Sequence, residues 1–185
     1  TGIDLTPEFI EAARALTEMT GLGDLVSFKV ADALNLPFAD GAFDAGFTQN
    51  VSMSVPDKAR FFEEAARVLK SGARFIAGEV AQGPGGDALY PVPWALTADI
   101  SHLTSPEDTV EVLEAAGFRV DEVQDSTEKA LAYNQAARER FKTSGPSVLN
   151  PSVILSEQGL DRMRNSARNI EQRRTLLVEF ICIRA

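Results

Sequence analysis

Acidic and amide side chains follow several of the apolar runs in this sequence. Asp4 and Asp32 each end a short run, Gln49 and Asn50 follow a third, and Glu79 lies near the end of a fourth. In open α/β sheets, ligands bind beyond the carboxyl ends of the strands. A carboxylate can take both hydroxyl protons of a ribose, because it offers acceptor oxygens only. These positions therefore predict a nucleotide-type site.

Each acid also has a simpler interpretation. Asp4 precedes a predicted helix, whose first turn favours a negative charge. Asp32 suits a turn in which the side chain accepts a hydrogen bond from the backbone two residues on. Alternatively, Asp32 bonds the edge of a base while Leu34 covers the face of the ring. The residues alone leave these alternatives open for both acids.

Apolar periodicity predicts strands that alternate with helices along the chain. Such alternation is typical of a mostly parallel sheet covered on both faces. We therefore predict an α/β, Rossmann-like, doubly wound fold with an antiparallel C-terminal strand. The predicted strands are 1–5, 25–32, 42–48, 73–80, 118–126 and 174–185, and the predicted helices are 7–19, 57–70, 105–116, 127–142 and 156–172.

Local signals mark where the helices begin. Thr6, Asp57 and Ser105 are expected N-caps, because their side chains can accept from the free backbone amides of a first turn. The first helix should present one apolar face toward the core, because its apolar residues recur at helical spacing. These residues are Phe9, Ile10, Ala13 and Leu16.

Composition excludes several classes of protein. The net charge of −9 disfavours a nucleic-acid partner, since phosphate backbones select basic surfaces. No apolar run is long enough to span a membrane. The single cysteine, Cys182, excludes a disulfide framework within the chain and is expected to be a small buried apolar residue. One histidine and one cysteine give no metal-ligand spacing, so we predict no metal and a cytoplasmic location.

Three sequence motifs extend the argument from Asp4 and Asp32. They are "ADALNLPF", the "FD" before the third strand, and "ARVLKSGA" before the fourth. With them the chain resembles the class I S-adenosylmethionine-dependent methyltransferases, in the small-molecule branch. The resemblance covers residues 1 to about 80, and Ala73 replaces a second glycine that is common in the family.

The resemblance implies roles for several residues. Asp4 would bind the cofactor ribose, with Leu5 against the adenine. Asp32 would contact the adenine amino group, and Gln49 would border the methionine portion or the methyl group. The remaining cofactor contacts would come from the two residues beside the adenine ring, Ala33 and Leu34.

The segment after the third strand departs from the family pattern. It reads "QNVSMSVPD", so Asn50 stands where an acid is common and Ser54 where a histidine is common. An amide can orient a substrate but cannot take a proton at neutral pH. Asn50 is therefore only a weak catalytic candidate.

The glycine-rich loop of the family should precede Asp4 by about 20 residues. No such loop lies in this sequence, and the absence of an inner strand would leave unpaired backbone on both neighbours. We therefore expect the 185 residues to be an N-terminally truncated fragment that lacks part of the cofactor site. The N-terminal part of the same gene product, or another chain, would complete the sheet.

Two turn-rich insertions are expected to cover a substrate. They lie at about 83–104 and 143–156 within a single domain of residues 1–185. Tyr90, Trp94, His102 and Asn50 are candidates for the pocket lining, although the aromatics could equally be packing residues. His102 is a further weak candidate for a base, because imidazole titrates near neutrality.

The favoured function is methyl transfer from S-adenosylmethionine to an N or O atom of a small molecule, with S-adenosylhomocysteine as product. Two alternatives remain. One is a non-catalytic binding or assembly module with the same fold. The other is a nicotinamide-dependent oxidoreductase fragment, which the motifs disfavour. The sequence leaves open the acceptor, any catalytic base and a homodimer.

Overall fold

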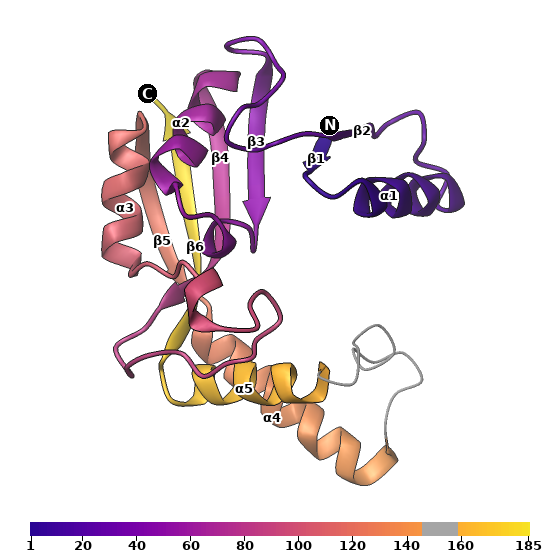
Figure 1. The fold of residues 1–185 in the computed structure, drawn as a ribbon, viewed down its shortest axis with the longest axis vertical. Coiled ribbons are helices and arrows are strands. Elements are labelled where there is room, and N and C mark those ends of the chain that lie inside the picture. The colour runs from indigo at the N-terminus through magenta and orange to yellow at the C-terminus, as the bar shows by residue number, and fades with distance from the viewer. Residues whose placement is uncertain (146–158) are drawn as a thin grey trace.

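The largest layer of the molecule is a four-stranded sheet with the order β3-β4-β6-β5 (Figure 1). The computed structural model describes residues 1–145 and 159–185. β3 pairs with β4 in parallel, whereas β6 runs antiparallel to both β4 and β5. The prediction of an α/β fold with an antiparallel C-terminal strand is confirmed. The strand bounds are Phe43–Gln49 for β3, Leu69–Gln82 for β4, Phe118–Asp125 for β5 and Thr175–Arg184 for β6.

A smaller unit formed by β1, α1 and β2 stands beside this sheet. β1 and β2 pair in parallel as a separate two-stranded sheet. In Figure 1 this unit lies on the β3 side of the larger sheet, with a gap between β1 and β3. The described strands therefore form two sheets rather than one. The bounds are Gly2–Asp4 for β1, Pro7–Met19 for α1 and Phe28–Val30 for β2.

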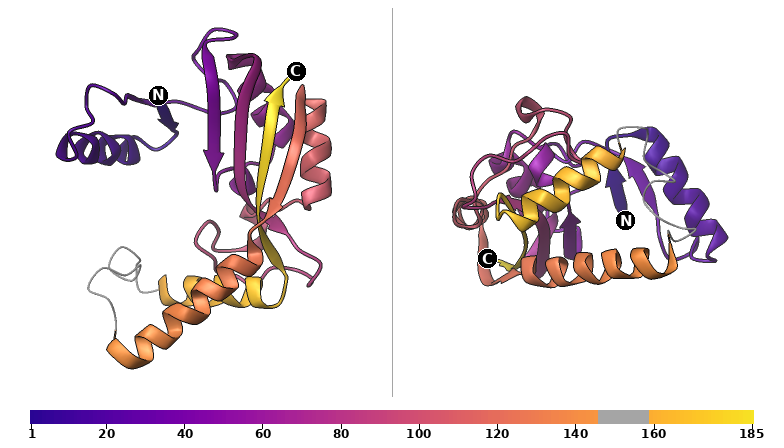
Figure 2. Two further views of the ribbon diagram at one scale, coloured as in Figure 1. Left: turned by 180° about the vertical axis from the view of Figure 1, so that it is seen from behind. Right: turned by 90° about the horizontal axis from the view of Figure 1, so that it is seen from below.

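Two helices cover one face of the larger sheet and enclose the main core. They are α2 (Lys58–Val68) and α3 (Pro106–Ala115). Phe62 and Phe180 are fully buried there, and Phe62 meets Phe75 edge-to-face. The view from behind in Figure 2 shows no helix on the opposite face of these four strands among the described residues.

Two element boundaries differ from the predictions. The predicted strand 25–32 is reduced to β2, because β2 pairs only with the three-residue β1 and Leu25 is left exposed. The predicted helix 57–70 ends at Val68, because Leu69 already pairs with Phe43 and begins β4. Pairing between β3 and β4 therefore takes the place of the last residues of the predicted helix.

The helix starts are partly as predicted. The Asp57 side chain accepts from the Arg60 amide and the Ser105 side chain accepts from the Asp108 amide, which confirms both N-caps. Thr6 occupies the N-cap position of α1, as predicted, but its side chain accepts no capping hydrogen bond. Its backbone amide donates to Asp4 Oδ1 over 2.7 Å, in a side-chain–backbone turn just before the helix.

The prediction that α1 turns one apolar face toward the core is also wrong in part. Ile10 is buried, but Phe9 is 64% exposed and Leu16 is 61% exposed. Within the described part of the chain, α1 packs mainly on the short strands β1 and β2. The six residues of β1 and β2 offer too little surface to bury the whole apolar face of α1.

A helical lobe lies beyond the carboxyl end of β3 (Figures 1 and 2). It combines the loop 83–104, which contains the 3₁₀ helix η2 (Ala98–Ile100), with α4 (Thr127–Ser144) and α5 (Gly159–Glu171). The first residues of the predicted insertion 143–156 belong to the end of α4. Its remainder lies outside the described residues, apart from Gly145.

The loop enters this lobe through a close backbone contact. The Gly83 and Gly85 amides donate to carbonyls of the turn before β6, and a Cβ on Gly85 would lie 2.0 Å from the Gln172 carbonyl oxygen. Only glycine allows the two backbones to approach this closely. The start of the loop is therefore tied to the end of α5.

Cys182 is fully buried on β6, as predicted. Burial raises the pKa of its thiol to about 12, because a thiolate is poorly solvated in the core. We expect no alkylation by iodoacetamide at about pH 8 in the native protein and full alkylation after unfolding. Mass spectrometry of both samples checks this prediction, and rapid labelling of the native protein would contradict the buried position.

Among residues 1–145 and 159–185, no helix combines the length and the apolarity needed to cross a membrane.

Candidate functional site

Asp4 and Asp32 lie at neighbouring strand ends. Asp4 is opposite Val30 in the β1–β2 ladder, and its carbonyl accepts from the Ala31 amide over 2.9 Å. Asp32 follows directly on the same edge. The structure thus brings together two acids that are 28 residues apart in the sequence.

Each of these carboxylates uses one oxygen for a local turn. Asp4 Oδ1 accepts from Thr6, and Asp32 Oδ1 accepts from the Leu34 amide over 2.8 Å. Among the described residues, no hydrogen bond is recorded for the second oxygen of either acid. Local bonds of this kind fix the carboxylates in place and leave acceptor capacity for a ligand. Leu5, beside Asp4, is 69% exposed and presents an apolar surface at the same edge.

Ala33 and Leu34 are packed against the core of the larger sheet. The Leu34 carbonyl also accepts from Arg60 Nε on α2 over 3.0 Å. These contacts link the segment after Asp32 to the larger sheet. The predicted contact of both residues with an adenine ring stays a prediction.

A second group of predicted residues gathers at the end of β3. Gln49 lies opposite Gly78 in the β3–β4 ladder, and the Asn50 amide donates to the Gly78 carbonyl over 2.8 Å. Asn50 has a positive φ of 55°, so the chain turns sharply there into the 3₁₀ helix η1 (Ser52–Ser54). The His102 amide donates to the Met53 carbonyl over 2.8 Å, which brings the loop 83–104 against η1.

Two buried charged residues bond to the backbone of η1. The sequence places Glu79 among the strand-end positions of the predicted site but assigns it no role, and it does not single out Lys58. Glu79 is 4% exposed and its Oε2 accepts from the Ser52 amide over 3.1 Å. Lys58 is 7% exposed, and its Nζ donates to the Ser52 carbonyl over 2.6 Å. The position of Glu79 near a strand end was the only available signal, and nothing local marked Lys58.

Burial shifts the ionisation of both groups. It raises the pKa of Glu79 to about 7, an effect that the Ser52 hydrogen bonds and the Lys58 charge only partly oppose. It also lowers the pKa of Lys58, although the charge of Glu79 acts in the other direction. Glu79 therefore changes its charge near neutral pH.

The aromatic residues of the loop are half-buried and are supported from α5. Asn169 is fully buried and forms two hydrogen bonds with the backbone of Leu89, and Asn165 donates to the Pro91 carbonyl. Tyr90 lies between these two anchors. Trp94 donates from Nε1 to the Ser101 hydroxyl over 3.0 Å, next to His102.

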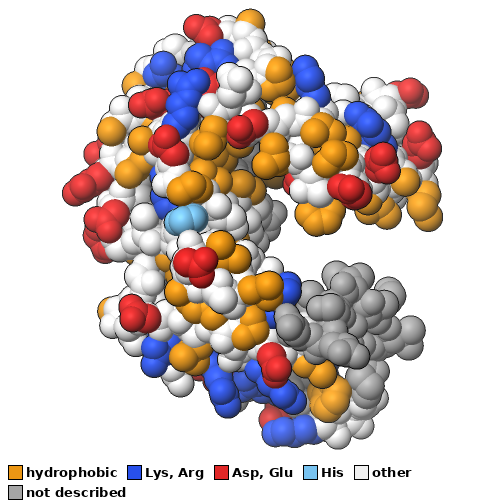
Figure 3. Space-filling model, viewed as in Figure 1, with side chains coloured by type: hydrophobic (Ala, Val, Ile, Leu, Met, Phe, Trp, Pro, Cys, Tyr) orange, Lys and Arg blue, Asp and Glu red, His pale blue; other side chains and the backbone are white. Residues whose placement is uncertain are grey.

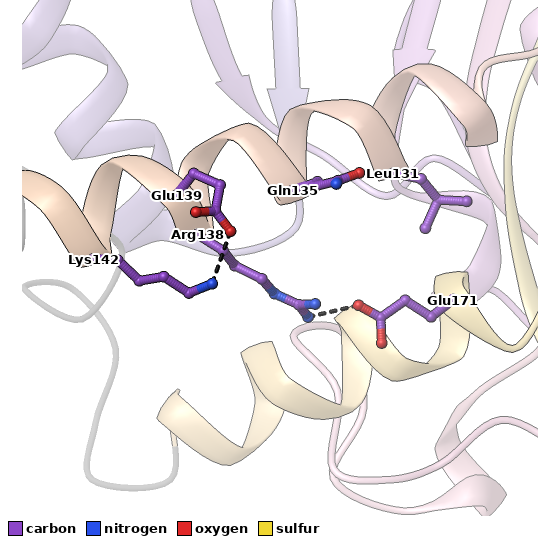
Figure 4. Close-up of a pocket in the computed structure, with 6 residues that line it drawn as sticks. All are labelled: Leu131, Gln135, Arg138, Glu139, Lys142 and Glu171. Carbon is purple, nitrogen blue, oxygen red and sulfur yellow. Dashed lines mark hydrogen bonds and ion pairs between the residues drawn. The ribbon is translucent and has the colours of Figure 1, made fainter.

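A charged cavity lies between α4 and α5 (Figure 4). Arg138 pairs with Glu171 over 2.6 Å across the two helices, and Lys142 pairs with Glu139 over 2.7 Å. Gln135 and Leu131 complete its lining. The Arg138–Glu171 pair joins α4 to α5, whereas the Lys142–Glu139 pair lies within α4. None of the residues predicted for the site lies here.

The predicted residues thus form two groups rather than one. Asp4, Leu5 and Asp32 belong to the smaller unit, whereas Gln49, Asn50 and His102 belong to the larger sheet and its loop. Figure 3 shows a deep recess in this face of the molecule, between the N-terminal unit and the helical lobe. No hydrogen bond is recorded between the two groups in the described ranges. Nor do three His, Cys, Asp or Glu side chains of these ranges cluster as a metal site would require.

The first comparison with known proteins covers the part of the chain that carries both acids. Residues 1–77 match a family model described as "Methyltransferase domain". This N-terminal part of the chain is therefore similar to methyltransferase domains. The matched residues include β1, β2, β3, α2 and the "ADALNLPF" and "ARVLKSGA" motifs.

Relatives and solved structures show similarity to methyltransferases as well. The chain is 47% identical over 75 residues to a probable tocopherol O-methyltransferase, chloroplastic, from Oryza sativa subsp. japonica, covering 40% of this chain and 21% of the relative. It is similar in fold to geranyl diphosphate C-methyltransferase from Streptomyces coelicolor A3(2), which was crystallised with S-adenosyl-L-homocysteine. The TM-score is 0.75 at 19% identity, over 100% of this chain and 62% of that one.

The same fold also supports another activity. The [4+2]-cyclase SpnF matches with a TM-score of 0.69 at 21% identity, over 99% of this chain and 64% of that chain. The chain spans between 21% and 58% of the length of six of the curated relatives that it matches. Fold similarity at this level of identity establishes the architecture but not the reaction.

Proposed function

We propose that the protein transfers a methyl group from S-adenosylmethionine to an N or O atom of a small molecule. The observation that carries the proposal is the pair of acids at neighbouring strand ends, each with one oxygen fixed by a local turn. The match of residues 1–77 to the methyltransferase model supports it. The exposed Leu5 and the two free carboxylate oxygens fit a ligand that has a ribose and an aromatic base.

Each group of residues would have its own part in binding. Asp4 would accept from the ribose hydroxyls, and Asp32 would accept from the adenine amino group. Gln49 and Asn50 would border the reactive end of the cofactor, whose sulfonium supplies the methyl group. The loop 83–104 and the helices α4 and α5 would form the substrate cover, since they lie beyond the carboxyl end of β3.

Methyl transfer between bound partners depends mostly on alignment and on exclusion of water. Tyr90, Trp94 and His102 lie in the loop that could provide this exclusion, and η1 connects that loop to Gln49 and Asn50. Asn50 can orient an acceptor but cannot remove its proton. His102 is the residue of this group that could act as a base.

We further propose that a strand from the N-terminal part of the same gene product, or from another chain, completes the sheet between β1 and β3. The backbone edge of β3 opposite β4 has no partner strand among the described residues. Phe47 is 80% exposed and Ile76 is 43% exposed on the helix-free face nearby. Unpaired strand edges and exposed apolar faces are typical of surfaces that bind another polypeptide segment.

Calorimetric titration with S-adenosylhomocysteine tests the function, on the 185-residue chain and on the longest product of its gene. In the longer product, Asp4→Ala is expected to weaken binding by about 1.5–3 kcal/mol, because a charged acceptor is lost. Asp24→Ala, an exposed acid in a turn away from the strand ends, serves as the control and should leave affinity unchanged. Absence of binding by the longer product would refute the proposed cofactor.

A second candidate is a non-catalytic binding or assembly module. The local turn bonds of Asp4 and Asp32 favour it, because they explain both acids without a ligand. Unchanged affinity in Asp4→Ala would support this candidate. The cytoplasmic location and the homodimer are also proposals, which localisation of the tagged protein and sedimentation can test.

A further inference from the structure

The backbone of Ser52 lies between two buried charges of opposite sign. Its amide donates to Glu79 Oε2 over 3.1 Å, and its carbonyl accepts from Lys58 Nζ over 2.6 Å. Lys58 Nζ also donates to the Val55 carbonyl over 3.2 Å. The amide of Ser52 is therefore bonded to a side chain from β4, and its carbonyl is bonded to a side chain from α2.

Both side chains of this arrangement are removed from water, which costs free energy. Their opposite charges and the Ser52 backbone oppose this cost. Glu79 Oε1 has no hydrogen-bond partner among the described residues. By contrast, the buried Glu64 has both carboxylate oxygens bonded.

The held segment begins directly after the predicted cofactor residues. Gln49 ends β3, the chain turns at Asn50, and Ser52 is the next residue but one. Any movement of Ser52 would therefore move Asn50. The loop 83–104 would follow, because the His102 amide bonds to Met53.

We propose that Glu79 and Lys58 are positioning residues of the methyl-transfer site, which act through Ser52 to keep Gln49 and Asn50 in place for the bound cofactor. The inference rests on the proposed function. The ionised carboxylate is the stronger acceptor for the Ser52 amide. Protonation of Glu79 therefore loosens the segment, and the affinity for the cofactor falls on mild acidification.

The groups that face Glu79 are few. Lys58 on α2 supplies the nearby positive charge, and Ser52 on η1 supplies the hydrogen bonds. His102 lies in the loop packed on η1 and is the other ionisable side chain of this neighbourhood. The variant His102→Gln removes this side chain, so any pH dependence that remains does not come from it.

The test is calorimetric titration with S-adenosylhomocysteine from about pH 8 to about pH 6, on the longest product of the gene. The wild type is expected to bind S-adenosylhomocysteine about three- to tenfold more weakly at the lower pH, because only molecules with an ionised Glu79 bind it with full affinity. Glu79→Gln should bind weakly with no such pH dependence. His102→Gln should keep the pH dependence of the wild type, and the exposed control Glu63→Gln should keep both its affinity and its pH dependence.

Hydrogen–deuterium exchange gives a readout that is independent of the cofactor. In Glu79→Gln and in Lys58→Met, the protection factors of residues 50–55 should fall, while those of the core strands remain. If Glu79→Gln binds S-adenosylhomocysteine as tightly as the wild type at every pH, and if its residues 50–55 are equally protected, the positioning role is refuted. The proposed function would not be affected by that result. Absence of binding by the wild type at every pH would refute the proposed function and, with it, this inference.

Discussion

Glu64→Ala is expected to lower the free energy of unfolding by about 3 kcal/mol, because it removes a buried charge on which several donors converge. Glu64 is 1% exposed and accepts from Arg67 and from the Leu36 amide. Arg67 in turn donates to the Leu36 and Phe38 carbonyls. This network fastens the segment after Asp32 to α2, so its loss should also weaken cofactor binding. Urea denaturation measures the change.

The lowered pKa of Glu64 also predicts that the protein loses stability in acid. The hydrogen bond from Arg67 lowers the pKa of Glu64 from 4.5 to about 2, despite the opposing effect of burial. A lowered folded-state pKa stabilises the protein above pH 4.5, and this contribution is lost as the pH falls toward 2. Glu64→Gln should have a shallower acid dependence over this range.

Glu63→Ala is the matched control for Glu64. Its carboxylate is 55% exposed and lies 3.9 Å from Arg60. An exposed pair of this kind contributes little, so the change should stay within about 1 kcal/mol. Equal effects of the two substitutions would contradict the network at Glu64.

Phe62→Ala is expected to lower the free energy of unfolding by about 3–5 kcal/mol. Phe62 has no exposed surface and contacts the rings of Phe61 and Phe75 edge-to-face. Removal of its ring leaves a cavity between α2 and β4 that the surrounding side chains can only partly fill. Urea denaturation followed by circular dichroism measures the loss.

Phe47→Ala on β3 provides the matched control. In the 185-residue chain Phe47 is 80% exposed, and its replacement should change stability by less than about 0.5 kcal/mol. A loss at Phe47 as large as at Phe62 would contradict the exposed position. If a longer product of the gene covers this face, as we propose, Phe47→Ala should become costly there.

The signals that succeeded at the sequence level act over a few residues. Asp57 and Ser105 each cap a helix through an amide three residues away, and apolar periodicity placed the strands of the larger sheet. Thr6 shows the limit of such signals. It occupies the N-cap position of α1, but its side chain accepts no capping hydrogen bond.

The sequence by itself determined the α/β class, the antiparallel last strand and the resemblance to methyltransferases, because these depend on local patterns and motifs. Only the tertiary structure decided which side chains meet. It placed Asp4 beside Asp32, held Ser52 between Glu79 and Lys58, and anchored the loop at Leu89 to Asn169, 80 residues away. Each of these contacts depends on the relative placement of distant backbone segments, and no local pattern of residues encodes that placement.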